Sequence, residues 1–251
     1  MDLQKKTAII TGAGSGFGAG IAELFADHGA RIVVADIDEA HGNRTRDALR
    51  ARGAPAIAVK TDVSQSKDFA RLVKAAVKEF GALDIVVNNA GISHSRQPML
   101  DVDEAMYDRI FAVNVKSIFL SAKHCVPVFR RQGHGVICNI ASTAGVRPRP
   151  GLTWYNGSKS AVIGLTRAMA IELAPDHIRV NAINPVAGET PLLATFMGGD
   201  TPEKRAEFVK SIPLGRLSTA RDIAEAALYL CSDRASLVTG LCMEVDGGRC
   251  I

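Results

Sequence analysis

Features that mark several large classes of protein are missing from this 251-residue sequence. It contains no apolar run of about eighteen residues, the length that a membrane-spanning helix requires. The first ten residues, MDLQKKTAII, include two lysines but lack the apolar core of a secretory signal peptide. These absences predict a cytoplasmic protein with no membrane partner.

Metal-binding and nucleic-acid-binding patterns are also missing. The five cysteines are odd in number, and they show neither a CxxC pair nor His/Cys ligand spacing, so we expect no metal and a reducing compartment. The net charge is only +4, and lysine and arginine are spread along the chain rather than gathered in a stripe, so we expect no nucleic-acid partner. With 47% hydrophobic and 22% charged residues, the composition is that of a globular domain.

Short β-branched segments alternate with longer segments of helical length. The predicted strands are residues 7–11, 31–36, 56–62, 83–89, 135–142, 178–185 and 241–248, and the predicted helices include residues 16–28, 39–52, 66–80, 101–131 and 154–174. Nearly continuous apolar strands are typical of a parallel sheet covered on both faces. The alternation predicts an α/β fold with a Rossmann-type doubly wound parallel sheet of about seven strands in a single domain over residues 1–251.

One connection is much longer than the others. More than thirty residues separate Pro185 from the helix expected near Ala220, and they include several glycines and prolines. Long loops in compact domains are usually functional, so we expect a substrate lid at about 186–215, with a short helix in TPEKRAEFVKSI. A surface excursion without function is the alternative.

A glycine-rich segment, TGAGSGFG, follows the first strand and opens the first helix. Glycines at this junction allow the backbone to approach a pyrophosphate, whose charge then lies at the helix N-terminus. The common GxGxxG fingerprint would require glycine where Phe17 stands, so the pattern is TGxxxGxG. The predicted cofactor contacts in this loop are Gly12, Ser15, Gly16, Phe17 and Gly18.

Asp36 closes the second strand, at the distance where an acid accepts hydrogen bonds from an adenosine ribose. Its carboxylate would repel a 2′-phosphate, and neither Ile37 nor Ser15 is basic, so the sequence predicts NAD rather than NADP. Asp36 could instead only cap the turn. After the third strand, Asp62 and Val63 are expected to meet the adenine, although Asp62 could belong to the start of the next helix.

The segment YNGSK puts Tyr155 four residues before Lys159, so on a helix the two side chains share one face. Together with TGAGSGFG, NNAG at Asn88 to Gly91, Asn114 and Ser142, this order of motifs resembles the short-chain dehydrogenase/reductase family. The resemblance covers essentially the whole chain, as far as VDGG at Val245 to Gly248.

The resemblance implies a catalytic set of Asn114, Ser142, Tyr155 and Lys159. Tyr155 would exchange a proton with the substrate oxygen while hydride moves to or from the nicotinamide, and Ser142 would hold that oxygen. Asn114 would organise a water for proton relay, and Lys159 would also hold ribose hydroxyls. A cation about 4 Å away would lower the pKa of Tyr155 by roughly three units.

The same resemblance extends the cofactor site to Asn89, Ala90 and Gly91, and to Pro185, Val186, Gly188 and Thr190 after the sixth strand. Val186 departs from the family, which usually has glycine there, and this puts the contacts of that loop in question. Gly188 could supply the missing flexibility.

Substrate residues are harder to predict, because one fold hosts many substrates. The candidates are His94, Ser142, Ala144, Val146, Trp154, Tyr155, Leu192, Leu193, Phe196 and Met197. Their apolar character favours a cyclic or aliphatic secondary alcohol as the small-molecule substrate. We interpret Arg147 and Arg149 as part of a solvated loop, although they could meet an anionic group.

Two other functions compete with an alcohol dehydrogenase. An NADPH-dependent 3-oxoacyl-[acyl-carrier-protein] reductase is common in the family, but Asp36 counts against NADPH. A dinucleotide sensor without activity would usually lack the tyrosine and lysine. The helix over 154–174 is apolar on more than one face, which favours a homotetramer, or a dimer, as the assembly.

Overall fold

The computed structural model describes all 251 residues and contains one parallel sheet of seven strands. The strands are β1 (Thr7–Thr11), β2 (Arg31–Asp36), β3 (Ala56–Lys60), β4 (Ile85–Asn88), β5 (Gly135–Ile140), β6 (Ile178–Pro185) and β7 (Cys242–Val245). Their order is β3-β2-β1-β4-β5-β6-β7, and every neighbouring pair is parallel. The predicted doubly wound α/β fold is confirmed.

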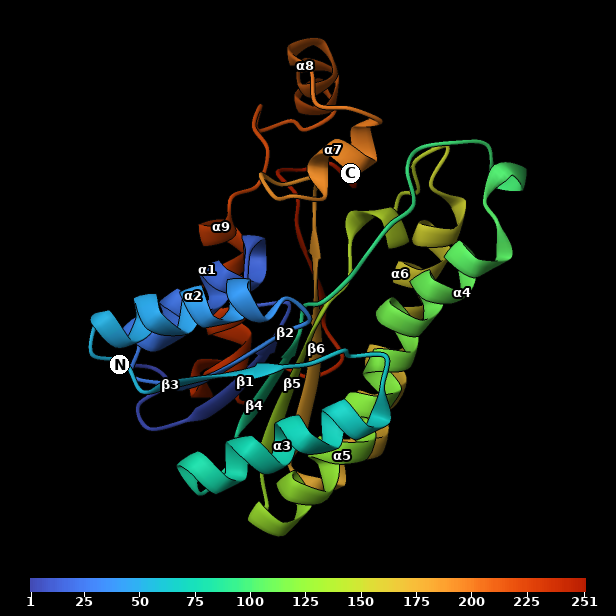
Figure 1. Cartoon of the computed structure of the whole chain (residues 1–251). Helices are drawn as coiled ribbons and strands as arrows, with labels where there is room; N and C mark the ends of the chain where they lie inside the picture. Colours follow the sequence, from blue (N-terminus) through green and yellow to red (C-terminus); the bar gives the residue numbers. More distant parts are fainter.

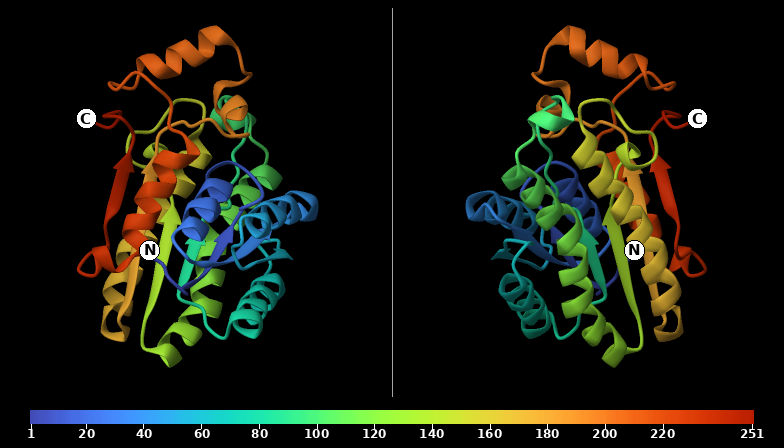
Figure 2. Two further views of the ribbon diagram at one scale, coloured as in Figure 1. Left: turned by 90° about the vertical axis from the view of Figure 1, so that its left-hand side faces the viewer. Right: turned by 90° about the vertical axis from the view of Figure 1, so that its right-hand side faces the viewer.

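Helices cover both faces of this sheet (Figures 1 and 2). One layer contains α1 (Gly16–Asp27), α2 (Glu39–Ala51) and α9 (Ala220–Cys231), and the other contains α3 (Ser66–Phe80), α4 (Glu104–Phe111), α5 (Ser117–Gln132) and α6 (Thr153–Leu173). In the first layer, α9 packs against α1. It begins with a reciprocal capping box between Thr219 and Asp222.

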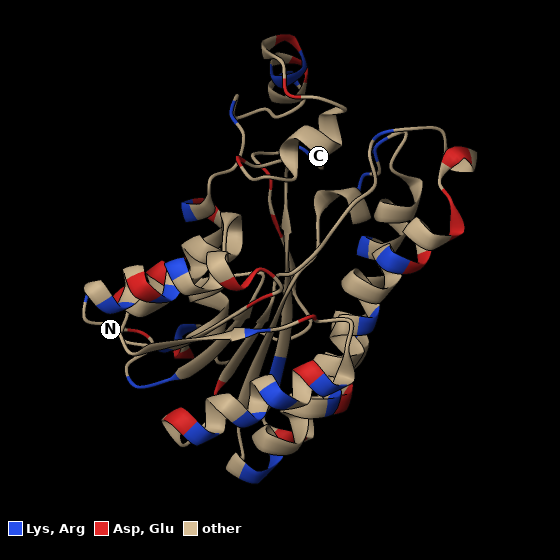
Figure 3. Ribbon diagram, in the orientation of Figure 1, with Lys and Arg blue, Asp and Glu red and all other residues tan.

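Alternate residues along each inner strand pack into opposite cores. In β1, Ala8 and Ile10 join the core beneath α1 and α9, whereas Ile9 joins the core beneath α3, α5 and α6. Because the strands are buried on both faces, their sequences show no polar alternation, which explains the continuous apolar segments. Charged residues of both signs lie along the outer helices (Figure 3). No helix combines the length and the hydrophobicity that crossing a bilayer demands.

The helix expected over 101–131 is interrupted. A 3-10 turn at Met99–Asp101 precedes α4, and a π-helical segment at Ala112–Lys116 joins α4 to α5. Asn114 lies in the π segment and is buried. Such π segments are frequently found at functional sites, and apolar periodicity alone does not reveal them.

The long connection after β6 carries two short helices, α7 (Leu193–Met197) and α8 (Pro202–Lys210). The short helix expected in TPEKRAEFVKSI is therefore confirmed, with Thr201 as its N-cap and proline at its first position. Val186, Leu193, Met197 and Phe208 form a small core that holds this segment together. In Figure 1 both helices lie beyond the carboxyl ends of the strands.

Candidate active site

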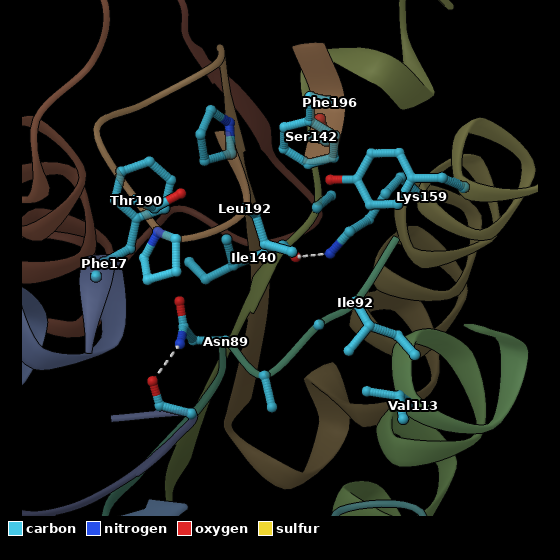
Figure 4. Close-up of a pocket in the computed structure, with 18 of the residues that line it drawn as sticks. Phe17, Asn89, Ile92, Val113, Ile140, Ser142, Lys159, Thr190, Leu192 and Phe196 are labelled. Atoms are coloured by element: carbon cyan, nitrogen blue, oxygen red, sulfur yellow. Dashed lines mark hydrogen bonds between the residues drawn. The ribbon is translucent and has the colours of Figure 1, made fainter. Parts of the chain in front are cut away.

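A pocket of about 500 Å³ lies at the carboxyl ends of the central strands. It is continuous from Asp36, at the end of β2, to Lys159 on α6. Carboxyl ends of parallel strands at a reversal of strand order are the usual ligand site of this fold. Figure 4 shows Phe17, Asn89 and Thr190 at one side of the pocket and Ser142, Lys159 and Phe196 at the other.

The glycine loop needs its glycines for two separate reasons. Gly12 has a φ of 63°, in the left-handed region that favours glycine. At Gly18, a Cβ atom would lie 2.3 Å from the carbonyl oxygen of Gly12. Gly18 does not line the pocket. Its missing side chain lets α1 pack against the loop that does. Asn89 fixes the same loop, because its side-chain amide donates to the carbonyls of Thr11 at 2.8 Å and Gly12 at 3.1 Å.

This loop suits a pyrophosphate. Gly12, Ser15, Gly16 and Phe17 all line the pocket, and α1 begins at Gly16, so its free backbone amides face the same space. Ser15 caps α1 in an extended conformation without a side-chain hydrogen bond to the helix. The residues present therefore fit a dinucleotide cofactor.

Asp36 and Ile37 line the pocket next to the loop, as do Asp62 and Val63. The carboxylate of Asp36 accepts hydrogen bonds from the backbone N–H of Gly14 at 2.8 Å and of Asp38 at 2.9 Å. Asp36 therefore caps the turn, and each of its carboxylate oxygens retains a lone pair that a ligand could use. Asp62 accepts from the N–H and hydroxyl of Ser64, so it also organises the turn before α3.

The end of β4 leads to Ala90 and Gly91, which line the pocket opposite Lys159. A Cβ atom on Gly91 would lie 3.3 Å from Nζ of Lys159 and 3.4 Å from Oδ1 of Asn114. The absent side chain thus leaves space between the ammonium and the amide. Oδ1 of Asn114 accepts a hydrogen bond from the backbone N–H of Ile92 at 2.9 Å, and Nδ2 of Asn114 donates to the backbone carbonyl of Ile92 at 2.9 Å.

Tyr155 and Lys159 lie on one face of α6, as their spacing predicts, and both are buried. Nζ of Lys159 donates to the carbonyl of Ile140 at 2.8 Å and lies 5.9 Å from the centroid of the Tyr155 ring. Burial raises the pKa of Tyr155 to about 12, while hydrogen bonding with Ser142 acts in the opposite direction. Burial also lowers the pKa of Lys159 to about 8.

The expectation that Lys159 depresses the pKa of Tyr155 is wrong for the protein alone. The ammonium is directed at a backbone carbonyl, and the loss of water around the phenol raises the pKa of Tyr155. Ser142 follows β5, where its Oγ accepts from the N–H of Ala144 at 3.0 Å. Both Ser142 and Tyr155 line the pocket.

In the loop after β6, the side chain of Val186 packs under the long connection. The side chain of Val186 is 4% exposed and packs with Leu193 and Phe208 beneath the long connection. Gly188 is needed for close approach, since a Cβ atom there would lie 2.4 Å from the ring of Phe17. Pro185, Val186, Gly188 and Thr190 all line the pocket.

The predicted substrate residues divide into two groups. Ser142, Ala144, Tyr155, Leu192 and Phe196 line the pocket, whereas His94, Val146, Trp154, Leu193 and Met197 do not. Trp154 faces away, because its Nε1 donates to the carbonyl of Met99 at 3.1 Å and its ring packs edge-on against Tyr107. His94 is 2% exposed and its Nδ1 lies 2.8 Å from the carbonyl oxygen of Ser95.

Several pocket residues were missed. Arg149 was assigned to a solvated loop, yet it is half-buried and lines the pocket. Ile92, Val113, Ile140 and Phe208 also contribute. Ile140 could have been found from its position at the end of a central strand, but no sequence signal marks the inward orientation of Arg149 or Phe208.

The fold and site define a dinucleotide-dependent oxidoreductase with a tyrosine and a lysine at its centre. The profile of the family described as "Enoyl-(Acyl carrier protein) reductase" matches residues 12–249. The chain is 49% identical to 4-formylbenzenesulfonate dehydrogenase of Comamonas testosteroni, over 99% of both chains. It is 37% identical to cis-4-hydroxycyclohexanecarboxylate dehydrogenase of Sinomonas cyclohexanicum, over 97% of this chain and 96% of that protein.

Among solved structures, the 3-ketoacyl-(acyl-carrier-protein) reductase of Brucella melitensis complexed with NADH matches with a TM-score of 0.94 and 48% identity, over 99% of this chain and 100% of that one. The protein belongs to the short-chain dehydrogenase/reductase family. It is an oxidoreductase of that family and uses a nicotinamide dinucleotide.

Proposed function

We propose that this protein is an NAD-dependent dehydrogenase that interconverts a secondary alcohol and a ketone, with a cyclic or aliphatic small molecule as substrate. The observation that carries the proposal is that Ser142 and the buried Tyr155 and Lys159 line one pocket together with the glycine loop. When bound, the nicotinamide supplies the hydride acceptor or donor. The residues of this chain supply binding, orientation and proton transfer.

In alcohol oxidation Tyr155 accepts the hydroxyl proton, and in ketone reduction it returns a proton to the oxygen. A phenol whose pKa is about 12 is a poor base at neutral pH, so it needs more positive charge than Lys159 provides alone. An oxidised nicotinamide carries that charge. Ser142 donates a hydrogen bond to the substrate oxygen. Its hydrogen bonding with Tyr155 partly offsets the burial that raises the tyrosine pKa.

Asn114 and Lys159 connect Tyr155 to a proton relay. Gly91 leaves the Lys159 ammonium and the Asn114 amide oxygen both facing the point that a Cβ atom would otherwise occupy, 3.3 Å and 3.4 Å away, and a water bridging these two groups is part of the proposal. Lys159, with a pKa of about 8, can exchange a proton near neutral pH. In this proposal Asn114 holds the water, and Lys159 also holds the ribose hydroxyls.

NAD preference rests on Asp36. The two pocket-lining residues at the end of β2, Asp36 and Ile37, include no cation. A carboxylate here accepts hydrogen bonds from ribose hydroxyls and repels a 2′-phosphate. The remaining cofactor contacts that we propose are Gly12, Ser15, Gly16, Phe17, Asp62, Val63, Asn89, Ala90, Gly91, Pro185, Val186, Gly188 and Thr190, all of which line the pocket.

The substrate end is apolar near the tyrosine. Ala144, Leu152, Leu192 and Phe196 line it, and the Phe196 ring lies 5.1 Å from that of Tyr155. Such a wall favours a ring or an aliphatic chain over a sugar. Residues 186–215, with α7 and α8, form the lid over this end in our proposal. Both relatives are named for compounds built on a six-membered ring, which supports a ring as substrate, and cis-4-hydroxycyclohexanecarboxylate is itself a secondary alcohol.

The test is turnover by purified protein with NAD⁺ or NADP⁺ and a panel of cyclic and aliphatic secondary alcohols, followed by reduced-nicotinamide absorbance. We expect NAD⁺-dependent turnover that falls about 10²- to 10⁴-fold in Tyr155→Phe. The control is Tyr107→Phe, which alters an exposed tyrosine outside the pocket. Undiminished turnover in Tyr155→Phe would remove Tyr155 from the mechanism, and a preference for NADP⁺ would remove the role of Asp36.

A carrier-dependent reductase is the second candidate function. The family description and the Brucella melitensis structure both name acyl-carrier-protein substrates. The panel therefore includes a 3-hydroxyacyl thioester. Turnover confined to that thioester with NADP⁺ would establish this alternative and reject the alcohol dehydrogenase. Dinucleotide binding without turnover of any compound would favour the sensor.

We also propose that the protein forms a homotetramer, with a dimer as the alternative, in the cytoplasm. The outer face of α6 is exposed to solvent. Ile171 is 79% exposed, and a Cβ atom on Gly164 would meet no atom within 4 Å. On α5, Phe119 is 59% exposed. Gly164→Arg should reduce the assembly to smaller species in size-exclusion chromatography with light scattering, and an unchanged mass would reject α6 as the interface. Cell fractionation tests the location.

A further inference from the structure

Arg149 is the feature of the pocket that an apolar alcohol leaves unexplained. It lies in the loop between β5 and α6, half-buried, and lines the same pocket as Ser142 and Tyr155. Its guanidinium carbon lies 4.3 Å from the centroid of the Phe208 ring, and its Nη2 donates to Oγ of Ser211 at 3.0 Å. These contacts hold the guanidinium over the Phe208 ring, against the segment that carries α8.

The charge of Arg149 is poorly compensated. Burial lowers its pKa to about 10, and the nearby positive charges of Arg249, Arg96 and Arg147 act in the same direction. Glu207 is the acidic side chain that opposes them. No ion pair joins Arg149 to a carboxylate, whereas Arg46, Arg205 and other surface arginines have such partners. A half-buried guanidinium without a carboxylate is costly unless a ligand pairs with it.

Arg249 provides a second, independent observation. Its side chain is nine-tenths buried, and its Nε and Nη1 have no hydrogen-bond partner. Arg147 is less available, since its Nη1 donates to the carbonyl of Arg249 and to the terminal oxygen of Ile251. The loop and the C-terminal segment thus bring unpaired cationic donors together beside the pocket.

The position of Arg149 is fixed relative to the tyrosine. The side-chain amide of Asn156 donates to the backbone carbonyl of Arg149 at 2.9 Å, and Asn156 directly follows Tyr155 on α6. Leu152 and Phe196 pack against Tyr155, Phe208 packs against Arg149, and all three apolar side chains line the same pocket. The pocket therefore offers a proton-transfer group, an apolar wall and then a cation.

We propose that Arg149 binds an anionic group on the substrate, so that the substrate is a hydroxylated or oxo ring compound with a carboxylate or sulfonate remote from the reacting carbon. The inference rests on the proposed function and specifies its substrate class. A guanidinium presents a planar pair of N–H donors, which suits a carboxylate or sulfonate. Its stacking on Phe208 keeps the fork oriented, and Arg249 adds positive potential.

The two named relatives agree with this chemistry. Both names, 4-formylbenzenesulfonate and cis-4-hydroxycyclohexanecarboxylate, describe a six-membered ring with an anionic group opposite the oxygen-bearing substituent. A ring of this kind would span from an oxygen held near Tyr155, across the apolar wall, to a guanidinium.

The experiment compares an anionic ring substrate with its neutral analogue. We would measure kcat/KM with NAD⁺ for cis-4-hydroxycyclohexanecarboxylate and for cyclohexanol in the wild type, Arg149→Met and Arg149→Lys. Two controls isolate position: Arg96→Met, an exposed neighbour outside the pocket, and Arg109→Met, which lines the pocket from α4. We expect the anionic-to-neutral ratio to fall about 10- to 100-fold in Arg149→Met, mainly through KM.

Arg149→Lys keeps the charge and should retain part of the preference, and Arg96→Met should leave the ratio unchanged. An equal ratio in the wild type and Arg149→Met, or loss of the preference in Arg109→Met alone, would overturn the inference. Because turnover depends on the proposed function, calorimetric binding of cyclohexanecarboxylate and cyclohexanecarboxamide to NAD⁺-saturated protein provides a separate readout. Charge-dependent binding lost in Arg149→Met without any turnover would support the anion site and reject the substrate class; binding that ignores charge would reject the site.

Discussion

At the cofactor end of the pocket backbone packs against backbone, whereas at the substrate end side chains pack against side chains. The Gly18 Cα hydrogens face the Gly12 carbonyl, and Asn89 binds that carbonyl through its amide. Near Tyr155, the wall consists of Leu152, Phe196 and Phe208, each from a different segment. The cofactor end therefore tolerates no added atom, and the substrate end can change shape by side-chain replacement.

Among the variants that test this difference between the two ends, we expect Gly18→Ala to have the largest effect. The new methyl group would lie 2.3 Å from the Gly12 oxygen and 2.5 Å from Nδ2 of Asn89, so α1 or the loop must move. We expect a stability loss of about 1–3 kcal/mol and at least a tenfold weaker NAD⁺ affinity, measured by urea unfolding and calorimetry. Gly157→Ala is the matched control, because a Cβ atom there would meet nothing within 4 Å and alanine favours the helix. Unchanged NAD⁺ affinity in Gly18→Ala would show that the loop adapts.

The contrast between the two ends also explains what the sequence could predict. Gly12, Asp36 and Lys159 lie at strand ends or on a regular helix face, where spacing fixes position, and all three line the pocket. The sequence also predicts the seven strands and the helix over 202–210, because regular elements leave a regular pattern of residues.

The sequence does not predict which way a side chain points when contacts far away in the chain decide it. Trp154 adjoins Tyr155 in sequence, but on a helix neighbouring residues point about 100° apart, and a partner at Met99 holds it outward. Arg149 was assigned to solvent because nothing in its own segment specifies Phe208 and Ser211, about sixty residues away, as its contacts. Likewise, nothing in its own segment specifies that Val186 packs with Leu193 and Phe208 beneath the connection after β6.

Lys159 lines the same pocket, and the burial of its ammonium makes the stability of the fold depend on pH. Its folded-state pKa is about 8, below the unfolded value of 10.5, so between these values the unfolded chain binds more protons. The free energy of unfolding should then rise with pH over this window, by about 3 kcal/mol from the contribution of Lys159. In Lys159→Met this rise should vanish, and the variant should be more stable than wild type at pH 7 while losing activity.

Urea unfolding of the cofactor-free protein between pH 7 and pH 10.5 measures this effect. The exposed Lys74→Met provides the control, with a pH dependence like that of wild type. If Lys159→Met followed the wild-type curve, the ammonium would not be paying a desolvation cost in the folded protein, and its contact with the Ile140 carbonyl would have to compensate fully.

The smallest expected effect lies at the substrate end, in Phe196→Ala. The Phe196 ring packs at 49° on Tyr155, so its removal widens the pocket beside the reacting group. A lost aromatic contact of about 1 kcal/mol corresponds to a roughly fivefold higher KM for a ring substrate. NAD⁺ affinity should stay unchanged, the reverse of the Gly18→Ala result.

Because burial is what raises the pKa of Tyr155, water admitted by the Phe196→Ala variant should also lower that pKa, which absorbance titration of tyrosinate would detect. Phe80→Ala, remote from the pocket, should alter stability but neither KM nor the titration. A change in NAD⁺ affinity in Phe196→Ala would mean that the two ends of the pocket are coupled through the connection over residues 186–215.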